Sequence, residues 1–272
     1  MQENKVISLD ELKQIQLDIL TKVHDFCVKN NIDYFLSYGT LIGAIRHKGY
    51  IPWDDDIDIE MTRPNYEKFL KSFNGAYREL EVYAPELDWN YYAPYANVCD
   101  NRTILKEKGI GHNGRVLGIK IDVFPIDGLP SDEALYDKMF KKSRLYNSLL
   151  VYNQRDFSQF INSMKSLNLK DCFKWIVGHT VPHSLIQKWM YKLATQYNYS
   201  SAKKAGLITF TPVKYSVDKS CFEHYIEVEF EGRTFYTIKD YDMYLRLLYG
   251  DYMQLPPIEE RIPHHNFHAT WK

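Results

Sequence analysis

Residues 34–61 read YFLSYGTLIGAIRHKGYIPWDDDIDIEM, and four of the five positions from 54 to 58 are aspartates. Adjacent like charges repel, and a carboxylate carried toward a protein interior is costly unless a positive group meets it. The stretch is therefore either a solvated turn or a place where a cation belongs.

The alternation of side chains along a strand separates these residues onto two faces. Ile57 and Ile59 are expected to face the core, which places Asp56 and Asp58 on the opposite face and Asp54 at the entrance of the strand. An Asp-x-Asp pair on one face suits Mg²⁺, which proteins usually hold with one or two carboxylates, waters and substrate phosphates. A solvated acidic turn is the alternative at this point.

Two further features favour a phosphate and metal site. Gly39 and Thr40 are expected between a strand and a helix start, where backbone N–H groups bind phosphate, and Arg46 and Lys48 follow on the same helix. Asp122 lies inside an apolar strand, GIKIDVFPID, where a carboxylate needs a reason. A third metal ligand would supply that reason, and a hydrogen-bonded loop aspartate is the alternative.

The rest of the chain is read from periodicity and turn residues. The first half predicts a helix capped by Ser8 that runs to about Asn30, a strand ending at Gly39, a helix stopped by Gly49, a strand over 56–61, a helix over 63–73, short strands and turns over 79–106, and a strand ended by Pro125 with a turn at Asp127-Gly128. The second half predicts helices over 131–199 broken at Pro182, a hairpin over 225–238 turning at Glu231-Gly232, a helix from Asp240 to Gly250, and an irregular tail. This order indicates an α/β or α+β fold with a small mixed sheet.

Composition excludes some classes of function. The 272 residues are 45% hydrophobic and 25% charged with a net charge of −1, which gives no electrostatic reason to expect a nucleic acid partner. The four cysteines form no CxxC pair, the N-terminus has no signal-peptide pattern, and no apolar stretch is long enough to span a bilayer. We expect a cytoplasmic protein, with work at the inner face of the cell membrane left open.

Three blocks carry a family resemblance: residues 34–61, IDVFPIDGLP at 121–130, and IKDYDMYLRLLYGDYMQLPP at 238–257. Gly-Thr, Asp-x-Asp and a later Asp together look like the nucleotidyltransferase superfamily. The blocks resemble more specifically the LicD family, which includes bacterial phosphocholine transferases and is related to fukutin and fukutin-related protein. The match extends in order from about residue 9 to 265.

The resemblance implies an α+β fold with a nucleotidyltransferase-like core, a small mixed β-sheet flanked by helices, and a helical insert. It implies one enzyme unit over 1–272, with the core at 1–130, the insert at 131–205, and a C-terminal hairpin and helix at 206–272 that complete the site.

The implied reaction moves phosphocholine from CDP-choline to a sugar hydroxyl of a lipid-linked glycan or teichoic acid precursor and releases CMP. Alternatives are another CDP-linked donor such as CDP-ribitol, or a non-catalytic nucleotide- or choline-binding module. Carried over residue by residue, the resemblance assigns Mg²⁺ and catalysis to Asp56, Asp58 and Asp122, an outer metal position to Asp54, and donor phosphate binding to Gly39, Thr40, Arg46 and Lys48.

Three other segments each allow more than one interpretation. Choline is recognised by aromatic faces, and the candidates are Trp53, Trp89, Tyr91, Tyr92 and Tyr95, which otherwise pack a core. His264, His265 and His268 are read as a solvated tail or a phosphate contact rather than a zinc site. Residues 173–193 form either an ordinary amphipathic helix or one that rests on an anionic membrane.

Overall fold

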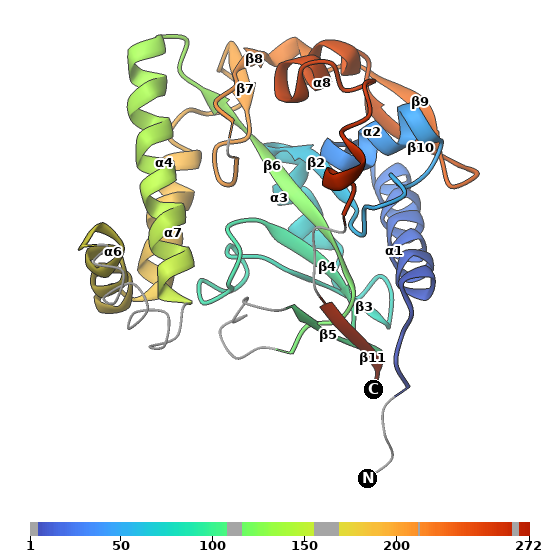
Figure 1. Cartoon of the computed structure of the whole chain (residues 1–272). Coiled ribbons are helices and arrows are strands. Elements are labelled where there is room, and N and C mark those ends of the chain that lie inside the picture. Colours follow the sequence, from blue (N-terminus) through green and yellow to red (C-terminus); the bar gives the residue numbers. More distant parts are fainter. Residues whose placement is uncertain (1–4, 108–115, 155–168, 212, 263–266) are drawn as a thin grey trace.

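The computed structural model describes residues 5–107, 116–154, 169–211, 213–262 and 267–272 (Figure 1). Its helices are α1 (Leu9–Asn30), α2 (Tyr38–His47), α3 (Arg63–Ser72), α4 (Glu133–Asn153), α6 (Leu169–Thr180), α7 (His183–Ala194) and α8 (Tyr241–Tyr249), with short 3₁₀ turns η2 (Lys219–Phe222) and η3 (Ile258–Glu260). Its strands are β1 (Phe35–Leu36), β2 (Asp58–Thr62), β3 (Leu80–Tyr83), β4 (Ala96–Asp100), β5 (Thr103–Glu107), β6 (Lys120–Leu129), β7 (Lys204–Gly206), β8 (Val217–Asp218), β9 (Tyr225–Phe230), β10 (Arg233–Ile238) and β11 (Phe267–Trp271).

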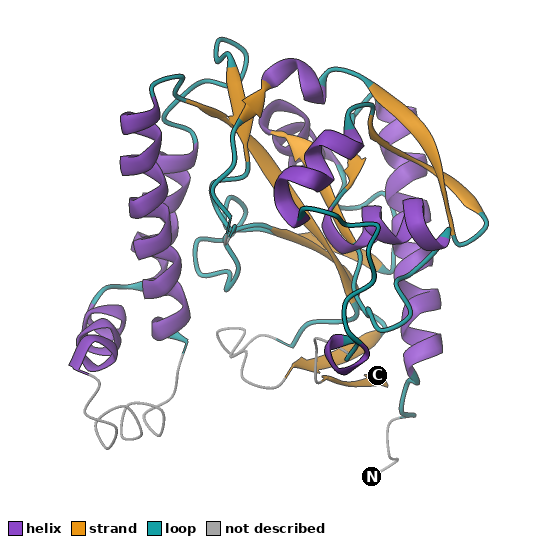
Figure 2. Ribbon diagram, turned by 45° about the horizontal axis from the view of Figure 1, so that its top comes forward, coloured by secondary structure: helices purple, strands orange, loops and turns teal. Residues whose placement is uncertain are grey.

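A mixed sheet forms the centre of the molecule, with strand order β1-β2-β6-β4-β3 and with β7 and β8 continuing from the far half of β6. Strands β2 and β6 run parallel, whereas the other pairs in this sheet are antiparallel. Helices α1 and α3 pack against it (Figures 1 and 2). The expectation of an α+β fold with a mixed sheet is confirmed.

The apolar side of the central strands behaves as the alternation predicts. Ile57, Ile59 and Met61 are fully buried. Helix α1 packs against β4 and β6 of the same sheet, and its start is fixed by Ser8, whose hydroxyl accepts a hydrogen bond from the Glu11 N–H at 3.2 Å. The predicted cap and length of this helix are confirmed.

The segment before α2 differs from the expectation. Only Phe35–Leu36 is strand, and the helix already begins at Tyr38, whose φ is 47°. Gly39 therefore lies in the first helical turn. The helix ends at Lys48, which takes the left-handed conformation (φ 60°). Gly49 lies against the hairpin turn, where a Cβ would lie 2.2 Å from a Glu231 carboxylate oxygen, so a larger residue would have to displace that side chain.

The prediction that Pro125 ends its strand is wrong, and so is the predicted turn at Asp127-Gly128. Strand β6 continues to Leu129. Its antiparallel neighbour β4 last pairs at Val123, and β7 first pairs at Asp127. Pro125 lies between these two ladders, where its missing N–H removes no hydrogen bond on that side.

The C-terminal third is mostly as expected. The 225–238 hairpin is confirmed, with positive φ at both turn residues, Glu231 (51°) and Gly232 (70°), as a type I′ turn requires. Helix α8 ends at Gly250 as predicted, but the Asp240 side chain makes no capping hydrogen bond. The prediction of an irregular tail is wrong in part, because the tail contains β11, which pairs with β5 160 residues earlier in the chain.

Helices α4, α6 and α7 stand together to one side of the sheet (Figure 2), and we call them the helical unit. They confirm the predicted helices and the break at Pro182, which is the N-cap residue of α7, while residues 155–168 of that prediction lie outside the described residues. Large apolar side chains remain exposed on α6 and α7: Phe173 (68%), Ile176 (49%), Leu185 (39%) and Trp189 (36%). Within the described parts of the chain, none of the helices combines the length and apolarity that crossing a bilayer requires.

Candidate active site

Three polar residues form one row across the centre of the sheet. Asp58 on β2 is the register partner of Asp122 on β6, and Asp122 is in turn the partner of Asn97 on β4. Side chains of directly paired residues point to the same face, with Cβ atoms about 4.5–5.5 Å apart. The sheet thus brings together two of the predicted aspartates from positions 64 residues apart in the chain.

The acidic loop before β2 is fixed by contacts from two helices. The Thr40 hydroxyl accepts a hydrogen bond from the Asp58 N–H at 2.8 Å. A Cβ on Gly39 would lie 2.5 Å from an Asp54 carboxylate oxygen, so a larger residue at the start of α2 would have to displace this side chain. From α1, the buried Gln16 amide donates to the Asp55 carbonyl at 3.0 Å. Thr40 and Gly39 therefore position the acidic residues, whereas their contact with phosphate stays a prediction.

The negative charges in and beside the row repel one another. Burial, followed by the carboxylates of Asp56, Asp122 and Asp54, raises the pKa of Asp58 well above its ordinary value. Lys120 offsets part of this rise, and its ammonium group lies 3.2 Å from the Asp122 carboxylate. Concentrated negative charge of this kind is what a divalent cation relieves.

The donor set of this site fits Mg²⁺, since carboxylate oxygens are the hard ligands that this ion prefers. Among the residues that the structure describes, however, no group of three or more His, Cys, Asp or Glu side chains could by itself hold an ion. The Asp58–Asp122 pair therefore matches the common Mg²⁺ arrangement, in which substrate phosphates and water complete the coordination. The four-aspartate ligand set remains a prediction.

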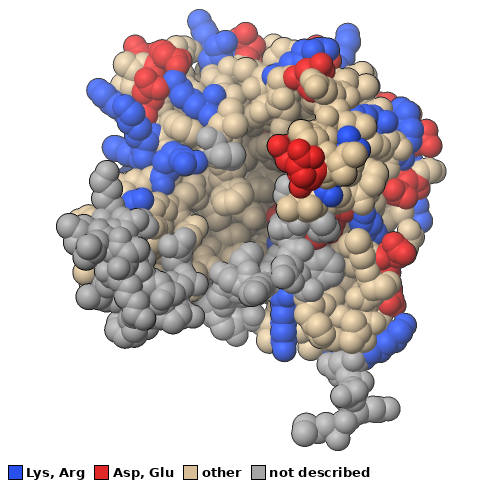
Figure 3. Space-filling model, in the orientation of Figure 1, with Lys and Arg blue, Asp and Glu red and all other residues tan. Residues whose placement is uncertain are grey.

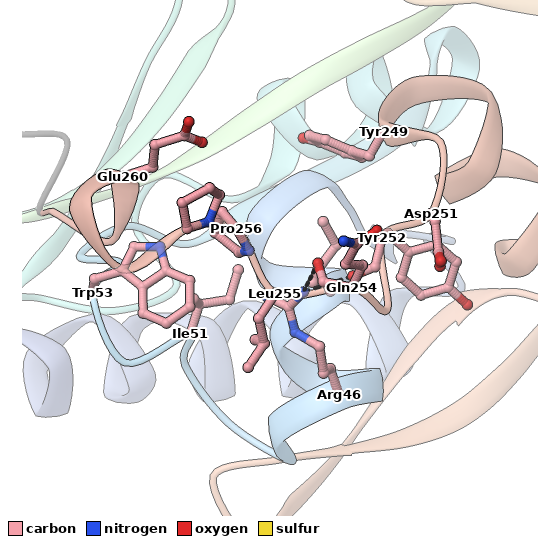
Figure 4. Close-up of a pocket in the computed structure, with 12 residues that line it drawn as sticks. Arg46, Ile51, Trp53, Tyr249, Asp251, Tyr252, Gln254, Leu255, Pro256 and Glu260 are labelled. Atoms are coloured by element: carbon pink, nitrogen blue, oxygen red, sulfur yellow. Dashed lines mark hydrogen bonds between the residues drawn. The ribbon is translucent and has the colours of Figure 1, made fainter.

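A pocket of about 440 Å³ adjoins the acidic loop (Figure 4). It lies between α2, the residues just before Asp54, and the segment after α8. Trp53 and Glu260 stand at one end, with Tyr249, Asp251 and Tyr252 at the other. The pKa of Tyr249 is raised, and the carboxylates of Asp58, Asp54 and Asp56 contribute to the rise, so this end of the pocket lies near these aspartates. The role of the C-terminal segment in completing the site stays a prediction.

The two predicted phosphate-binding cations occupy different places. Arg46 lines the pocket, where its guanidinium donates to the Tyr252 carbonyl at 2.6 Å and to the Gln254 carbonyl at 3.5 Å. Lys48 is exposed and is not among the pocket residues, and its carbonyl accepts from the N–H of Glu231 at the hairpin turn. Arg46 is thus the better placed of the two for a bound anion.

The aromatic segment at 89–95 mostly packs. Tyr91, Tyr92 and Tyr95 are nearly fully buried, and the half-buried Trp89 stacks edge-on against Tyr191. Trp53 differs, because it lines the pocket, and its ring already receives the Arg261 guanidinium at 5.4 Å from the centroid. Of the predicted choline-binding aromatics, Trp53 has the most suitable position.

The predicted histidine group is only partly covered by the structure. His264 and His265 lie outside the described residues. His268 is exposed on β11, opposite Lys106.

Glu60 is a site residue that the sequence reading missed. It follows Asp58 by two positions, is 2% exposed, and accepts hydrogen bonds from the Tyr244 hydroxyl at 3.0 Å and the Tyr215 hydroxyl at 3.4 Å. Burial raises its pKa to about 7, although the tyrosine hydrogen bonds act in the opposite direction. A carboxyl group that titrates near neutrality therefore lies beside the acidic row.

We expect Glu60 to make the protein less stable as the pH rises. Its pKa is near 7 in the folded chain and near 4.5 ordinarily, so the folded state binds the extra proton between these values. The stabilisation is complete below about pH 4.5 and is lost as the pH rises through 7, at a cost of about 3 kcal/mol.

Urea unfolding of the wild type and of Glu60→Gln at pH 5, 6, 7 and 8 checks this expectation. The variant should lose less unfolding free energy than the wild type over this range. Equal losses in both proteins would contradict it.

Asn97 and Lys120 were also missed, although each left a weak signal. Asn97 is an amide inside the otherwise apolar segment APYANVC, and Lys120 precedes Asp122 by two positions and so shares its face. An asparagine or a lysine at such a position is compatible with several chemical roles, so the sequence pattern alone did not select either residue.

Comparison with known proteins places this chain in a family. Residues 31–125, which carry the whole row, match the family model described as LicD/FKTN/FKRP, nucleotidyltransferase domain. The chain is 32% identical over 268 residues to the lipopolysaccharide cholinephosphotransferase LicD of Haemophilus influenzae, covering 96% of this chain and 97% of that protein. Uncharacterized proteins of Rickettsia typhi and Rickettsia prowazekii match shorter segments, with 50% identity over 52 residues and 51% over 41.

The two uncharacterized relatives share less than a fifth of their length with this chain, so they contribute nothing on activity. The Haemophilus protein is similar from end to end, including the helical unit and the C-terminal segment that lines the pocket. On this full-length similarity, the chain is a phosphotransferase and belongs to the LicD family.

Proposed function

We propose that this enzyme transfers phosphocholine from CDP-choline to a sugar hydroxyl of a cell-surface glycan or teichoic acid precursor and releases CMP. The observation that carries the proposal is the full-length similarity to a cholinephosphotransferase, in a chain whose sheet sets Asp58 beside Asp122. The pocket next to this pair gives the proposed donor a place to bind.

The reaction exchanges one phosphorus–oxygen bond for another. The acceptor hydroxyl oxygen bonds to the phosphorus that carries choline, the bond from that phosphorus to the bridging oxygen breaks, and CMP leaves with the electron pair. The hydroxyl proton passes to a base, and Asp122 is the residue we propose for it. Such transfers depend mainly on in-line positioning and on neutralising phosphate charge.

Asp58 and Asp122, with Asp56 and Asp54 nearby, are the residues that would hold Mg²⁺. When bound, the ion supplies positive charge to the donor diphosphate. Thr40 and the start of α2 are proposed to bind phosphate oxygens, with Arg46 contributing from the pocket side. In this arrangement the Lys120 ammonium, 3.2 Å from an Asp122 carboxylate oxygen, offsets part of the negative charge of the row.

The test is a CMP-release assay with the purified chain, offering CDP-choline, CDP-ethanolamine and CDP-ribitol with a panel of glycan acceptors, with and without Mg²⁺. We expect release that requires acceptor and Mg²⁺ and is fastest with CDP-choline. A tenfold or greater preference for CDP-ribitol would replace the choline assignment with ribitol phosphate transfer. Equal rates after metal removal would overturn the proposed cofactor.

Trp53 gives a sharper prediction on donor choice. A quaternary ammonium over an aromatic face contributes about 0.5–2 kcal/mol, so Trp53→Ala should raise the KM for CDP-choline about 2- to 30-fold. The KM for CDP-ribitol should change much less, because ribitol carries no charge. Trp189→Ala, which removes an exposed tryptophan of α7, is the control. Equal losses for both donors in Trp53→Ala would exclude the role.

The acceptor side is proposed to lie at the hollow that Figure 3 shows between the helical unit and the C-terminal segment. Exposed apolar side chains on α6 and α7, together with the exposed Lys188 and Lys192, favour a peripheral contact with an anionic membrane that carries a lipid-linked acceptor. Sedimentation of the chain with phosphatidylglycerol vesicles, but not with neutral vesicles, would support this contact. Absence from both would count against it.

A further inference from the structure

Asn97 occupies the end of the polar row and is completely buried. Its side-chain N–H donates to an Asp122 carboxylate oxygen, and its amide oxygen accepts from the hydroxyls of Tyr91 and Tyr92, the latter at 3.2 Å. Turning the amide over would set its oxygen against the Asp122 carboxylate. The two tyrosine hydroxyls thus fix which end of Asn97 faces Asp122.

The turn that carries these tyrosines is held by the helical unit. The Gln187 amide of α7 donates to the Tyr91 carbonyl at 2.8 Å and to the Ala93 carbonyl at 2.9 Å. His183 Nε2 lies 2.8 Å from the same Tyr91 carbonyl. From the end of α4, Gln154 donates to the Tyr92 carbonyl at 3.0 Å. Both helices therefore contact the backbone of one turn, and that turn contacts the row.

We infer that Asn97 is a positioning residue for Asp122, and that α4 and α7 set its orientation through Tyr91 and Tyr92. The inference rests on the proposed function, in which Asp122 acts on the acceptor hydroxyl or on the bound ion. A hydrogen bond from a fixed, buried amide limits rotation of the Asp122 carboxylate. The carboxylate of Asp122 then keeps one orientation relative to that of Asp58. This assigns the helical unit a part in the chemistry although it supplies no residue of the row.

The kinetic test compares Asn97→Leu with Asn74→Leu. Asn74 is also a structural amide, and its side chain bonds to the backbone carbonyl and N–H of Val82 rather than to the row. Asn97→Leu should lower kcat about 100-fold, and the double variant Tyr91→Phe/Tyr92→Phe about tenfold. The KM for CDP-choline should stay within about threefold of wild type in both. Asn74→Leu should keep the wild-type kcat once the folded fraction is measured. A kcat loss in Asn97→Leu no greater than in Asn74→Leu would overturn the inference.

A second readout needs no substrate. In protein labelled with ¹⁵N-asparagine, the Asn97 side-chain resonances are those missing from Asn97→Leu. We expect them to shift in Asp122→Asn, in Tyr91→Phe/Tyr92→Phe and in Gln187→Leu. Unmoved resonances in Asp122→Asn would overturn the positioning role, and unmoved resonances in Gln187→Leu would overturn the part of the helices. If the wild type releases no CMP from any donor, the proposed function fails while this measurement still decides on Asn97.

Discussion

Asp58→Asn should reduce CMP release at least about a thousandfold, a loss of about 4 kcal/mol of transition-state stabilisation. Asp58 is the one carboxylate that is both in register with Asp122 and influenced by Asp56 and Asp54. The amide keeps the shape of the side chain but removes its charge. The measurement is kcat with saturating CDP-choline, acceptor and Mg²⁺.

The same substitution should leave the fold intact and make the metal-free protein more stable at pH 8. The pKa of Asp58 is raised in the folded chain, so the stability that this group contributes falls as the pH rises above its ordinary pKa, and the amide, which does not ionise, avoids that loss. Mg²⁺ should raise the melting temperature of the wild type and not that of Asp58→Asn, because only the wild type then binds it.

Asp240→Asn is the matched control for Asp58→Asn, since Asp240 is exposed and makes no capping bond. It should change neither turnover nor the Mg²⁺ response. An Asp58→Asn enzyme that keeps a tenth of wild-type turnover would show that the row is not the catalytic site.

The parts of the fold that were predictable depend on neighbours in sequence. Helix α1 carries its own cap and stripe, and the hairpin carries its own turn, so local residues decide them. The acidic face of β2 followed from alternation alone, although Asp58 rather than Asp56 begins the regular strand.

The parts that were missed depend on distant partners. A proline usually ends a strand. Pro125 lies inside β6 because the ladder with β4 stops before it and the ladder with β7 starts after it. The tail strand β11 forms because it can pair with the edge of β5, and the residues FHATW themselves do not indicate that this edge is available. A lone apolar-polar alternation of five residues is compatible with several structures.

The site shows the same division. Its charged members were found because adjacent aspartates are chemically unusual, and Asp122 because a carboxylate is unusual in an apolar strand. Glu60 and Asn97 became visible only when the sheet register placed them beside these residues. Tyr215 and Tyr244, whose hydroxyls donate to Glu60, come from distant segments of the chain. Tyr91 and Tyr92, which donate to Asn97, lie in the turn just before its strand.

Arg63→Met should destabilise the fold by about 3–5 kcal/mol, the usual cost of leaving a buried charge without its partner. Arg63 is 7% exposed and follows directly after β2. Its guanidinium makes two hydrogen bonds, of 2.7 and 3.0 Å, to the buried Asp127 carboxylate of β6 and one of 2.8 Å to Glu86. It thus ties together the ends of the two strands that carry Asp58 and Asp122. Urea unfolding at pH 8 measures the loss.

Two companions separate charge from packing in this prediction. Arg63→Met/Asp127→Leu should recover much of the loss, because it removes the stranded carboxylate along with the arginine. Lys204→Met, which breaks an exposed pair with Asp218, should cost at most about 1 kcal/mol. The Arg63→Met deficit should also shrink at pH 5. Burial already raises the pKa of Asp127 to about 6, and without Arg63 the group binds a proton still more readily. A loss of unfolding free energy below 1 kcal/mol at pH 8, or one unchanged by the second substitution, would mean that this ion pair does not stabilise the fold as predicted.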